Sequence, residues 1–272
     1  MKASALALGL VALAAPAFAQ QPAQDGQGVA AQARRIPGYL TAATTPDAYA
    51  TIPPAPQAGE PRNDADWKIF RDTRVLEGSE RWKLAQNDNA LRAADLLKDF
   101  SCSIGAELTQ QNAPTLSTLI SRVTVDAGSA ANRAKDIYKR TRPFQNNPGN
   151  ICIDRDGGIA NSFDYPSGHS SLSWAVGLSL AQIAPDRATS ILTRARAYGE
   201  SRIVCGVHNW SAVEAGRTNA SGVYAALQGN AEFKVDLEKA RAEVEAARKS
   251  GPKPDAAVCS KEAELSKPLQ LK

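Results

Sequence analysis

The stretch Tyr165-Pro-Ser-Gly-His-Ser-Ser171 joins a turn, several hydroxyl and backbone donors and a histidine directly before an apolar helical run. Pro166 fixes its own φ and disfavours helix at Tyr165, while Gly168 lets the backbone approach a ligand closely. The N–H groups that follow have no acceptor within a helix, and together with the positive end of the helix dipole they favour phosphate. The same residues are also typical of a serine-capped helix with a surface histidine, so the neighbouring segments decide between the two interpretations.

Apolar residues recur every three or four positions on both sides of this stretch. Stripes of this kind run over residues 96–104, 116–137, 172–183 and 233–247, and the third stops before Pro185. Alternation typical of strands is scarce, and we find no internal repeat. We therefore expect an all-α, single-domain helical bundle. Residues 146–164 are rich in Asn, Pro, Gly and Asp, which predicts a long loop, and long loops inside compact domains are often functional.

The chain is predicted to begin with a secretory signal at residues 1–19. Lys2 supplies the positive start, an apolar run follows, and Ala17-Phe-Ala19 fits a cleavage site, so the mature protein would start at Gln20 in the periplasm. An uncleaved membrane anchor is the alternative, but the run is shorter than the roughly 20 residues of a spanning helix. Three segments are expected after cleavage. They are a Pro/Ala-rich N-terminal arm at 20–65, a helical domain at 66–250 and a C-terminal tail at 251–272.

Composition and charge exclude several kinds of partner. The chain has 272 residues, 43% of them hydrophobic, and a net charge of +4, which is too mild to indicate a nucleic acid partner. Its basic residues are spread along the chain without an aromatic-interleaved patch. No later segment offers an uncharged apolar run of about 20 residues, so we expect no membrane contact in the mature form.

Four cysteines in an exported chain predict two disulfides. They are Cys102, Cys152, Cys205 and Cys259. Three pairings are open, and of these we expect Cys102 with Cys152 and Cys205 with Cys259, which would tie the tail to the domain. The cysteine spacing does not suit zinc, and with only two histidines we expect no metal site.

Cationic residues accompany both histidines, His169 and His208. Lys135 and Arg142 are seven residues apart, which places them on nearly the same helix face and lets both converge on one ligand. Taken alone, this pair is typical of a solvated face, and Arg202 is typical of a surface or salt-bridged arginine. Three segments in register give a stronger signal than any one of them.

Together the segments read Lys, six residues, Arg-Pro; then Pro-Ser-Gly-His; then Ser-Arg, five residues, His. This order and spacing resembles the type 2 phosphatidic acid phosphatase superfamily, and most closely its exported bacterial class A non-specific acid phosphatases. The likeness extends from the Pro-rich segment 52–56 to residues 215–217. The resemblance implies a helical bundle of the acid phosphatase and vanadium haloperoxidase type that hydrolyses phosphate monoesters without a metal or other cofactor.

The resemblance also implies a role for each motif residue. His208 would be the nucleophile that forms a phosphohistidine, and His169 the general acid that protonates the departing alkoxide and later activates water. The phosphoryl oxygens would be bound by five residues, namely Lys135, Arg142, Ser167, Gly168 and Arg202. Inorganic phosphate and vanadate would act as inhibitors.

One position departs from the family pattern. An aspartate normally lies four residues after the nucleophilic histidine and orients its ring, but Ala212 stands there. Glu214 falls on a different helix face from His208, and Ser211 is better placed but a weaker acceptor. A backbone carbonyl or a carboxylate from elsewhere in the chain could replace the aspartate. Without a replacement, the chain would be a slow enzyme or a protein that binds phosphate or phosphoesters with weak or lost turnover.

Two further functions stay open from the sequence. A vanadium-dependent haloperoxidase shares the anion cradle, although those chains are usually much longer, and a purely structural exported helical protein would bind no phosphate. The sequence leaves open the preferred ester, phosphate transfer to alcohols, the pH optimum and whether the chain forms a homo-oligomer.

Overall fold

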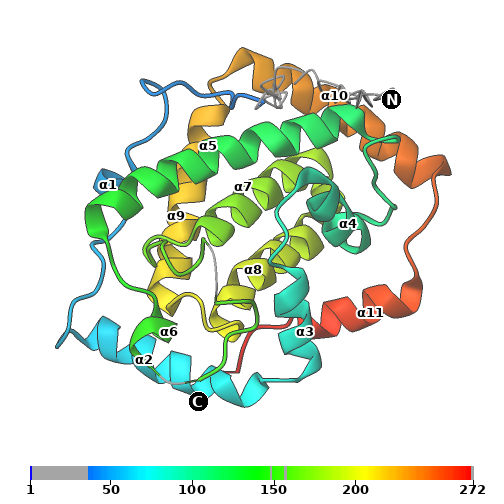
Figure 1. The fold of residues 1–272 in the computed structure, drawn as a ribbon. Coiled ribbons are helices and arrows are strands. Elements are labelled where there is room, and N and C mark those ends of the chain that lie inside the picture. Colours follow the sequence, from blue (N-terminus) through cyan, green and yellow to red (C-terminus); the bar gives the residue numbers. More distant parts are fainter. Residues whose placement is uncertain (2–35, 148, 156–157, 271–272) are drawn as a thin grey trace. The chain divides into compact units, whose positions relative to one another are not determined.

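The structure is a computed structural model that describes residue 1 and residues 36–147, 149–155 and 158–270. The described residues form helices joined by loops, and no strand occurs among them (Figure 1). The predicted all-α fold is therefore confirmed. The predicted signal sequence lies outside the described residues apart from Met1, and so does the arm as far as residue 35.

The described α-helices and two 3₁₀ turns follow one another in chain order as α1 (Ala48–Thr51), α2 (Pro61–Thr73), η1 (Arg74–Leu76), α3 (Glu80–Asn87), α4 (Ala93–Ile104), α5 (Pro114–Tyr138), α6 (Pro143–Asn146), α7 (Gly168–Ile183), η2 (Pro185–Arg187), α8 (Ala188–Val204), α9 (Trp210–Leu227), α10 (Ala231–Ser250) and α11 (Ala256–Leu265). The predicted boundary between arm and domain, at residues 65 and 66, falls inside α2.

Helix α7 lies at the centre of the bundle, with α5, α8 and α9 packed around it (Figure 1). Its predicted apolar stripe supplies Val176, Leu180 and Ile183 to the main core, and Leu172 packs against that core. Because these residues are removed from water by helices on several sides, α7 is anchored along its length. The Pro-Ser-Gly-His motif therefore sits at the N-terminus of the central helix.

The chain before α2 packs against the segment that leads into α7. Ile52 and Ala55 are buried in a small apolar cluster with Tyr165, and the Tyr165 hydroxyl donates to the Pro53 carbonyl at 2.6 Å. Asp47 caps α1 by accepting from Tyr49 N. The described part of the arm thus supports the turn that precedes the Pro-Ser-Gly-His motif.

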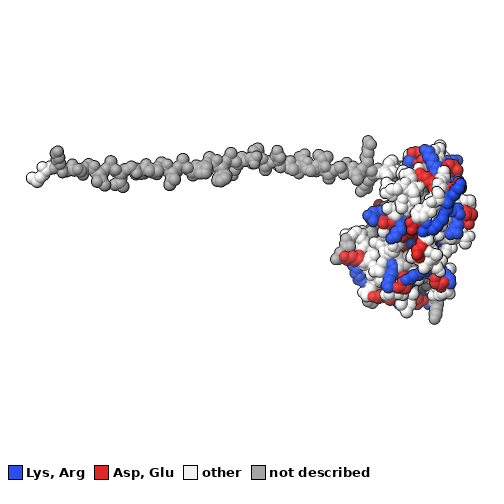
Figure 2. All heavy atoms as spheres, turned by 90° about the vertical axis from the view of Figure 1, so that its right-hand side faces the viewer, with Lys and Arg blue, Asp and Glu red and all other residues white. Residues whose placement is uncertain are grey.

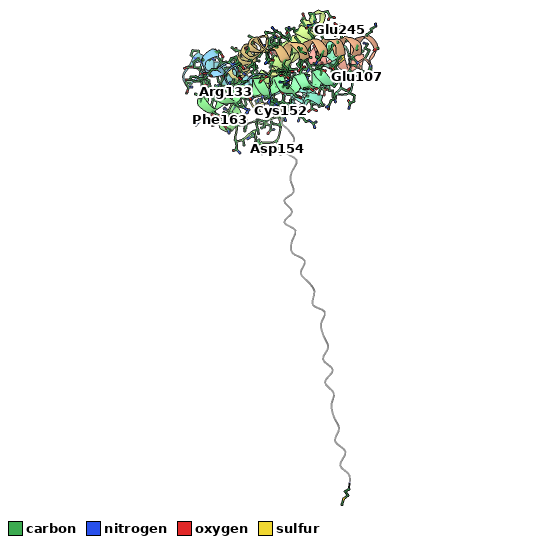
Figure 3. The ribbon with its side chains drawn as sticks, turned by 90° about the horizontal axis from the view of Figure 1, so that it is seen from above. Glu107, Arg133, Cys152, Asp154, Phe163 and Glu245 are labelled. Carbon is green, nitrogen blue, oxygen red and sulfur yellow. A yellow bond between two sulfur atoms is a disulfide. The ribbon has the colours of Figure 1, made fainter. Side chains whose placement is uncertain are left out.

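The disulfides join Cys102 to Cys259 and Cys152 to Cys205, so both expected pairs were wrong. Cys102 on α4 faces α11, whereas Cys152 lies beside the end of α8, where its N–H also donates to the Cys205 carbonyl at 3.0 Å. Cysteines that follow each other in the sequence, such as Cys102 and Cys152, therefore lie on different parts of the helical domain and do not pair. The tail is tied to the domain, as expected, but through α4. Figure 3 shows the loop that carries Cys152, Asp154 and Phe163 at one side of the helices.

The surface around α10 and α11 mixes charges of both signs (Figure 2). Ion pairs such as Arg248 with Asp186 at 2.5 Å and Arg241 with Glu238 at 3.1 Å contribute to this pattern. None of the described helices is long and apolar enough to cross a membrane.

Candidate active site

The three motif segments meet beside the N-terminus of α7. Lys135 comes from the last turn of α5, Arg142 from the connection to α6, and Arg202 from the last turn of α8. His208 follows in the link to α9, and His169 is the second residue of α7. The structure brings these residues together, since the charge of Arg142 acts on Lys135, Arg202 and His208, and that of Arg202 acts on His169.

Lys135 is buried, and its ammonium donates to the Phe163 carbonyl in the loop before α7. Burial and the nearby positive charge of Arg142 lower the pKa of Lys135 to about 7. The side chain is therefore cationic in acidic solution and loses its charge near neutral pH. Lys135 therefore offers a positive charge to an anion mainly in acidic solution.

Arg142 is held by the loop and by the turn that carries His208. Its Nε donates to the Ser162 carbonyl at 2.9 Å, and one Nη1 bond reaches the Val207 carbonyl at 2.7 Å. The same Nη1 lies 2.9 Å from His208 Nε2. A guanidinium can only donate, so Nε2 must be the unprotonated nitrogen that accepts this bond. Burial lowers the pKa of Arg142 to about 10, which leaves it charged at any acidic pH.

Arg202 has no exposed surface, and none of its three guanidinium nitrogens has a hydrogen-bond partner among the described residues. Its carbonyl accepts from the N–H groups of Val207 and His208 at 3.1 and 3.2 Å, which fixes the turn between the two motif residues. Burial lowers its pKa to about 10, so it stays cationic. A buried cation without partners is costly, and an oxyanion would satisfy it.

The N-terminus of α7 completes this cationic surface. Ser167 is the N-cap, and its Oγ accepts from Ser170 N at 3.3 Å and from Ser170 Oγ at 3.0 Å. Its own hydroxyl proton is therefore left to donate to another group. A Cβ built on Gly168 would meet no heavy atom within 4 Å, so the start of this helix faces open space. Backbone and hydroxyl donors are thus presented where phosphate was predicted to bind.

His169 contacts the segment between α3 and α4. Its Nε2 lies 3.2 Å from the Asn89 carbonyl, which can only accept, so Nε2 carries a proton and Nδ1 is left to exchange one. Exclusion of water and the charge of Arg202 hold the pKa of His169 well below its ordinary value. Without an anion nearby, the ring is neutral.

His208 is buried and is hydrogen-bonded on both sides of its ring. Nδ1 lies 2.9 Å from Asp164 Oδ1, opposite the Arg142 contact at Nε2. Because Nε2 accepts, Nδ1 carries the proton and donates it to Asp164. Burial and the charges of Arg142 and Lys135 keep the pKa of His208 well below its usual range. The ring is a neutral imidazole with its lone pair at Nε2, which is the form required of a nucleophile.

Asp164 was not predicted from the sequence, where it formed part of a loop. It directly precedes Tyr165 and occupies the place at the His208 ring that the motif pattern assigned to residue 212. Ala212 is instead buried in the apolar cluster with Tyr165. Of the substitutes considered, Glu214 pairs with Arg217, and Ser211 bonds to Asp66. The signal that could have identified Asp164 is its carboxylate beside the Pro-Ser-Gly-His motif, since the sequence left open a carboxylate from elsewhere in the chain.

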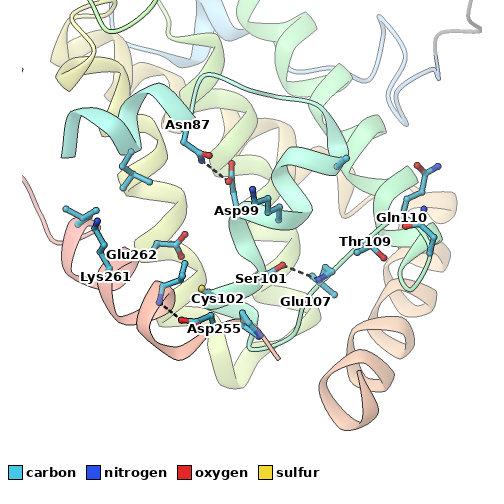
Figure 4. Close-up of a pocket in the computed structure, with 18 residues that line it drawn as sticks. Asn87, Asp99, Ser101, Cys102, Glu107, Thr109, Gln110, Asp255, Lys261 and Glu262 are labelled. Atoms are coloured by element: carbon cyan, nitrogen blue, oxygen red, sulfur yellow. Dashed lines mark hydrogen bonds between the residues drawn. The ribbon is translucent and has the colours of Figure 1, made fainter. Parts of the chain in front are cut away.

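A large cavity in the described part of the chain is separate from these residues. It has a volume of about 810 Å³ and lies between α4 and α11, where Asp99, Cys102 and Glu262 are among its lining residues (Figure 4). Burial raises the pKa of Asp99 to about 6. Among the described residues, no group of three or more His, Cys, Asp or Glu is placed to hold a metal ion.

Comparison with known proteins agrees with the motif pattern. Residues 114–227 match the PAP2 superfamily. The chain is 43% identical over 209 residues to an acid phosphatase of Zymomonas mobilis subsp. mobilis, a match that covers 76% of this chain and 79% of the relative. It is 36% identical over 207 residues to a non-specific acid phosphatase of Providencia stuartii, covering 75% and 84%. A non-specific acid phosphatase of Salmonella typhimurium is 31% identical over 195 residues, covering 71% and 78%.

Proposed function

The chain belongs to the PAP2 superfamily and is an acid phosphatase, and we propose that it hydrolyses phosphate monoesters through a phosphohistidine on His208. The observation that carries this mechanism is the pair of hydrogen bonds on the His208 ring. Arg142 donates to Nε2 at 2.9 Å and Asp164 accepts from Nδ1 at 2.9 Å, so the nucleophilic lone pair is directed at the cationic surface.

In the first step, His208 Nε2 attacks phosphorus and the bond from phosphorus to the ester oxygen breaks. Arg142 gives up its bond to Nε2 and donates to the phosphoryl oxygens, which Lys135 and Arg202 also neutralise. His169 delivers a proton to the departing oxygen. In the second step, His169 takes a proton from water, whose oxygen attacks phosphorus and breaks the bond to nitrogen. Inorganic phosphate leaves, and both histidines return to their starting state.

The opposite protonation states of the two histidines follow from what each contacts. His208 is kept neutral by three cations and by burial, as attack requires. The pKa of His169 is low for the same reasons, but a bound phosphate dianion would cancel the charge of Arg202 and raise that pKa. We therefore expect His169 to become protonated together with substrate binding, which favours acidic solution.

The remaining features of the proposal concern location and substrates. Two disulfides are typical of proteins outside the cytoplasm, and with the predicted signal at residues 1–19 they support export to the periplasm. Two of the relatives carry the name non-specific acid phosphatase, which supports broad specificity for phosphate monoesters. Inorganic phosphate and vanadate should compete with substrate for the same cations.

A phosphate-binding protein with lost turnover was the alternative suggested by Ala212. Asp164 argues against it, because a carboxylate does contact His208 Nδ1. The absence of an orienting carboxylate, which motivated the phosphate-binding alternative, is therefore made good by Asp164.

Release of phosphate from an aryl phosphate in excess EDTA tests the proposal. We expect turnover at acidic pH in the wild type and none in His208→Ala, with competitive inhibition by vanadate. Quenching in alkaline detergent during turnover of radiolabelled substrate should leave label on the wild-type protein that survives alkali and is lost on acid treatment, as expected of phosphohistidine. Turnover that persists in His208→Ala would contradict the mechanism, and a wild type without turnover would contradict the enzyme itself.

A further inference from the structure

We infer that Asp164 is the positioning residue for the nucleophile and that Arg140, one of the six unspecified residues between Lys135 and Arg142 in the first motif, keeps its carboxylate in place and ionised. The inference rests on the proposed function, because it concerns how His208 is made reactive. Asp164 precedes the motif in sequence, whereas the expected aspartate would have followed the histidine on α9. The orienting carboxylate reaches the same imidazole nitrogen from a different segment of the chain.

Asp164 has no exposed surface, yet both oxygens of its carboxylate accept hydrogen bonds. Oδ1 accepts from His208 Nδ1 at 2.9 Å and from Asn209 N at 3.1 Å. Oδ2 accepts from Asn209 Nδ2 at 2.9 Å and lies 3.3 Å from Arg140 Nη1. Three donated hydrogen bonds and the nearby charge of Arg140 favour the ionised form of this carboxylate. The carboxylate therefore accepts a hydrogen bond from His208 Nδ1 and does not donate one.

Arg140 supplies a full positive charge beside these donors, as an ion pair with Asp164. Its main-chain carbonyl accepts from Asp164 N at 2.8 Å, so the two residues are paired through backbone as well as side chain. In its side chain, Nη2 donates to Asp66 Oδ2 on α2 at 2.8 Å, and Nη1 donates to Ser211 Oγ at 2.9 Å. Asp66 in turn accepts from Ser211 N at 2.8 Å. Arg140 thus joins α2, the start of α9 and the loop before α7 around one carboxylate.

The charges that face Asp164 set its pKa and therefore the acidic limit of activity. Burial raises the pKa of Asp164, whereas Arg140 and Lys135 act to lower it. Arg142 faces it across His208, and Asp66 offsets part of the Arg140 charge. If Asp164 were protonated, it would donate to Nδ1 and move the ring proton to Nε2, which removes the nucleophilic lone pair. Activity should therefore be lost at low pH as Asp164 takes up a proton.

Asp164→Asn keeps the size of the side chain but can present an amide donor to Nδ1. We expect kcat to fall by about 10²- to 10⁴-fold, by analogy with the loss of a triad carboxylate, while KM stays within a few-fold because the phosphate-binding cations are unchanged. Asp186→Asn, which removes an exposed carboxylate on η2, is the matched control and should leave both constants unchanged. Nitrogen NMR of the histidines should place the His208 proton on Nδ1 in the wild type and on Nε2 in Asp164→Asn.

Variants at Arg140 provide a second test if Asp164→Asn fails to fold. Arg140→Gln should move the acidic limb of the kcat profile to higher pH, since Asp164 then loses its cation, and Arg140→Lys should move it part of the way back. Wild-type kcat in Asp164→Asn, a His208 proton that stays on Nδ1, or an acidic limb unaffected in Arg140→Gln would overturn the inference. The NMR measurement needs no turnover, so a wild type without activity would contradict the proposed function while the tautomer still tests this inference.

Discussion

At the scale of single residues, Lys135 should set an upper pH limit for phosphate binding. Its pKa is lowered to about 7, so the ammonium is charged below that pH and neutral above it. Affinity for phosphate should therefore fall as pH rises through about 7, and Lys135→Arg should extend binding to higher pH because arginine keeps its charge. Inhibition constants for phosphate, measured from pH 5 to pH 9, check this. Equal pH dependence in both proteins would contradict it.

His169 should matter in proportion to how poor the leaving group is. A general acid contributes about 10²- to 10⁴-fold when the departing oxygen needs a proton. We expect His169→Gln to lose that much kcat/KM on an alkyl phosphate but far less on p-nitrophenyl phosphate, whose phenolate leaves unprotonated. The ratio of kcat/KM values for the two esters is the measurement, because kcat/KM reports the first step and excludes the later attack of water. An equal loss on both would contradict the role of His169 as the acid for the leaving group.

The motif residues could be predicted from the sequence, whereas Asp164 could not. Lys135, Arg142, Arg202 and the two histidines stand at fixed spacings, and the structure places them together. Asp164 has no spacing relation to His208, since the two are 44 residues apart and meet only because the loop returns to the start of α9. A contact of this kind depends on the path of the loop, which residue types alone do not define.

At the scale of helices, the close approach of α7 and α9 should depend on Gly216. A Cβ at this position would lie 2.6 Å from the Ser167 carbonyl oxygen and 2.9 Å from Ser170 Cβ. Gly216→Ala must therefore displace the start of α7, and we expect a loss of about 1–3 kcal/mol in the free energy of unfolding together with reduced kcat. Chemical denaturation and phosphatase assays measure the two effects.

Gly222→Ala is the matched control on the same helix. The nearest heavy atom to its added Cβ would be Pro46 Cβ at 4.0 Å, so the substitution fits without displacement. We expect it to stabilise α9 by about 0.5–1 kcal/mol and to leave kcat unchanged. If both glycine variants behaved alike, the contact between α9 and the anion-binding turn would have no functional consequence.

The periodicity that predicted the helices was reliable because burial imposes it. The stripe on α7 is one example, since Val176, Leu180 and Ile183 are all in the core. The disulfides carried no such signal. Their pairing depends on which helices lie between the cysteines, and α11 crosses back to α4 with no buried residue that could have marked the contact.

At the scale of the whole molecule, both disulfides should contribute to stability, but only one of them should also affect catalysis. Each closes a long loop, since Cys102 and Cys259 are 157 positions apart in the sequence and Cys152 and Cys205 are 53 positions apart. Chain entropy predicts that either bond stabilises the protein by about 2–5 kcal/mol. Only the second lies next to the turn from Arg202 to His208, since Cys205 falls inside it.

We therefore expect the double variant Cys152→Ser/Cys205→Ser to have a lower melting temperature and a lower kcat, because the turn that presents His208 is no longer tied to the loop. The double variant Cys102→Ser/Cys259→Ser should have a lower melting temperature but keep kcat within about two-fold of the wild type. It releases only α11, which carries no buried residue. Melting curves and kcat of both variants, measured well below their melting temperatures, test this difference. A larger loss of kcat in the second variant than in the first would contradict it and would connect α11 to the active site.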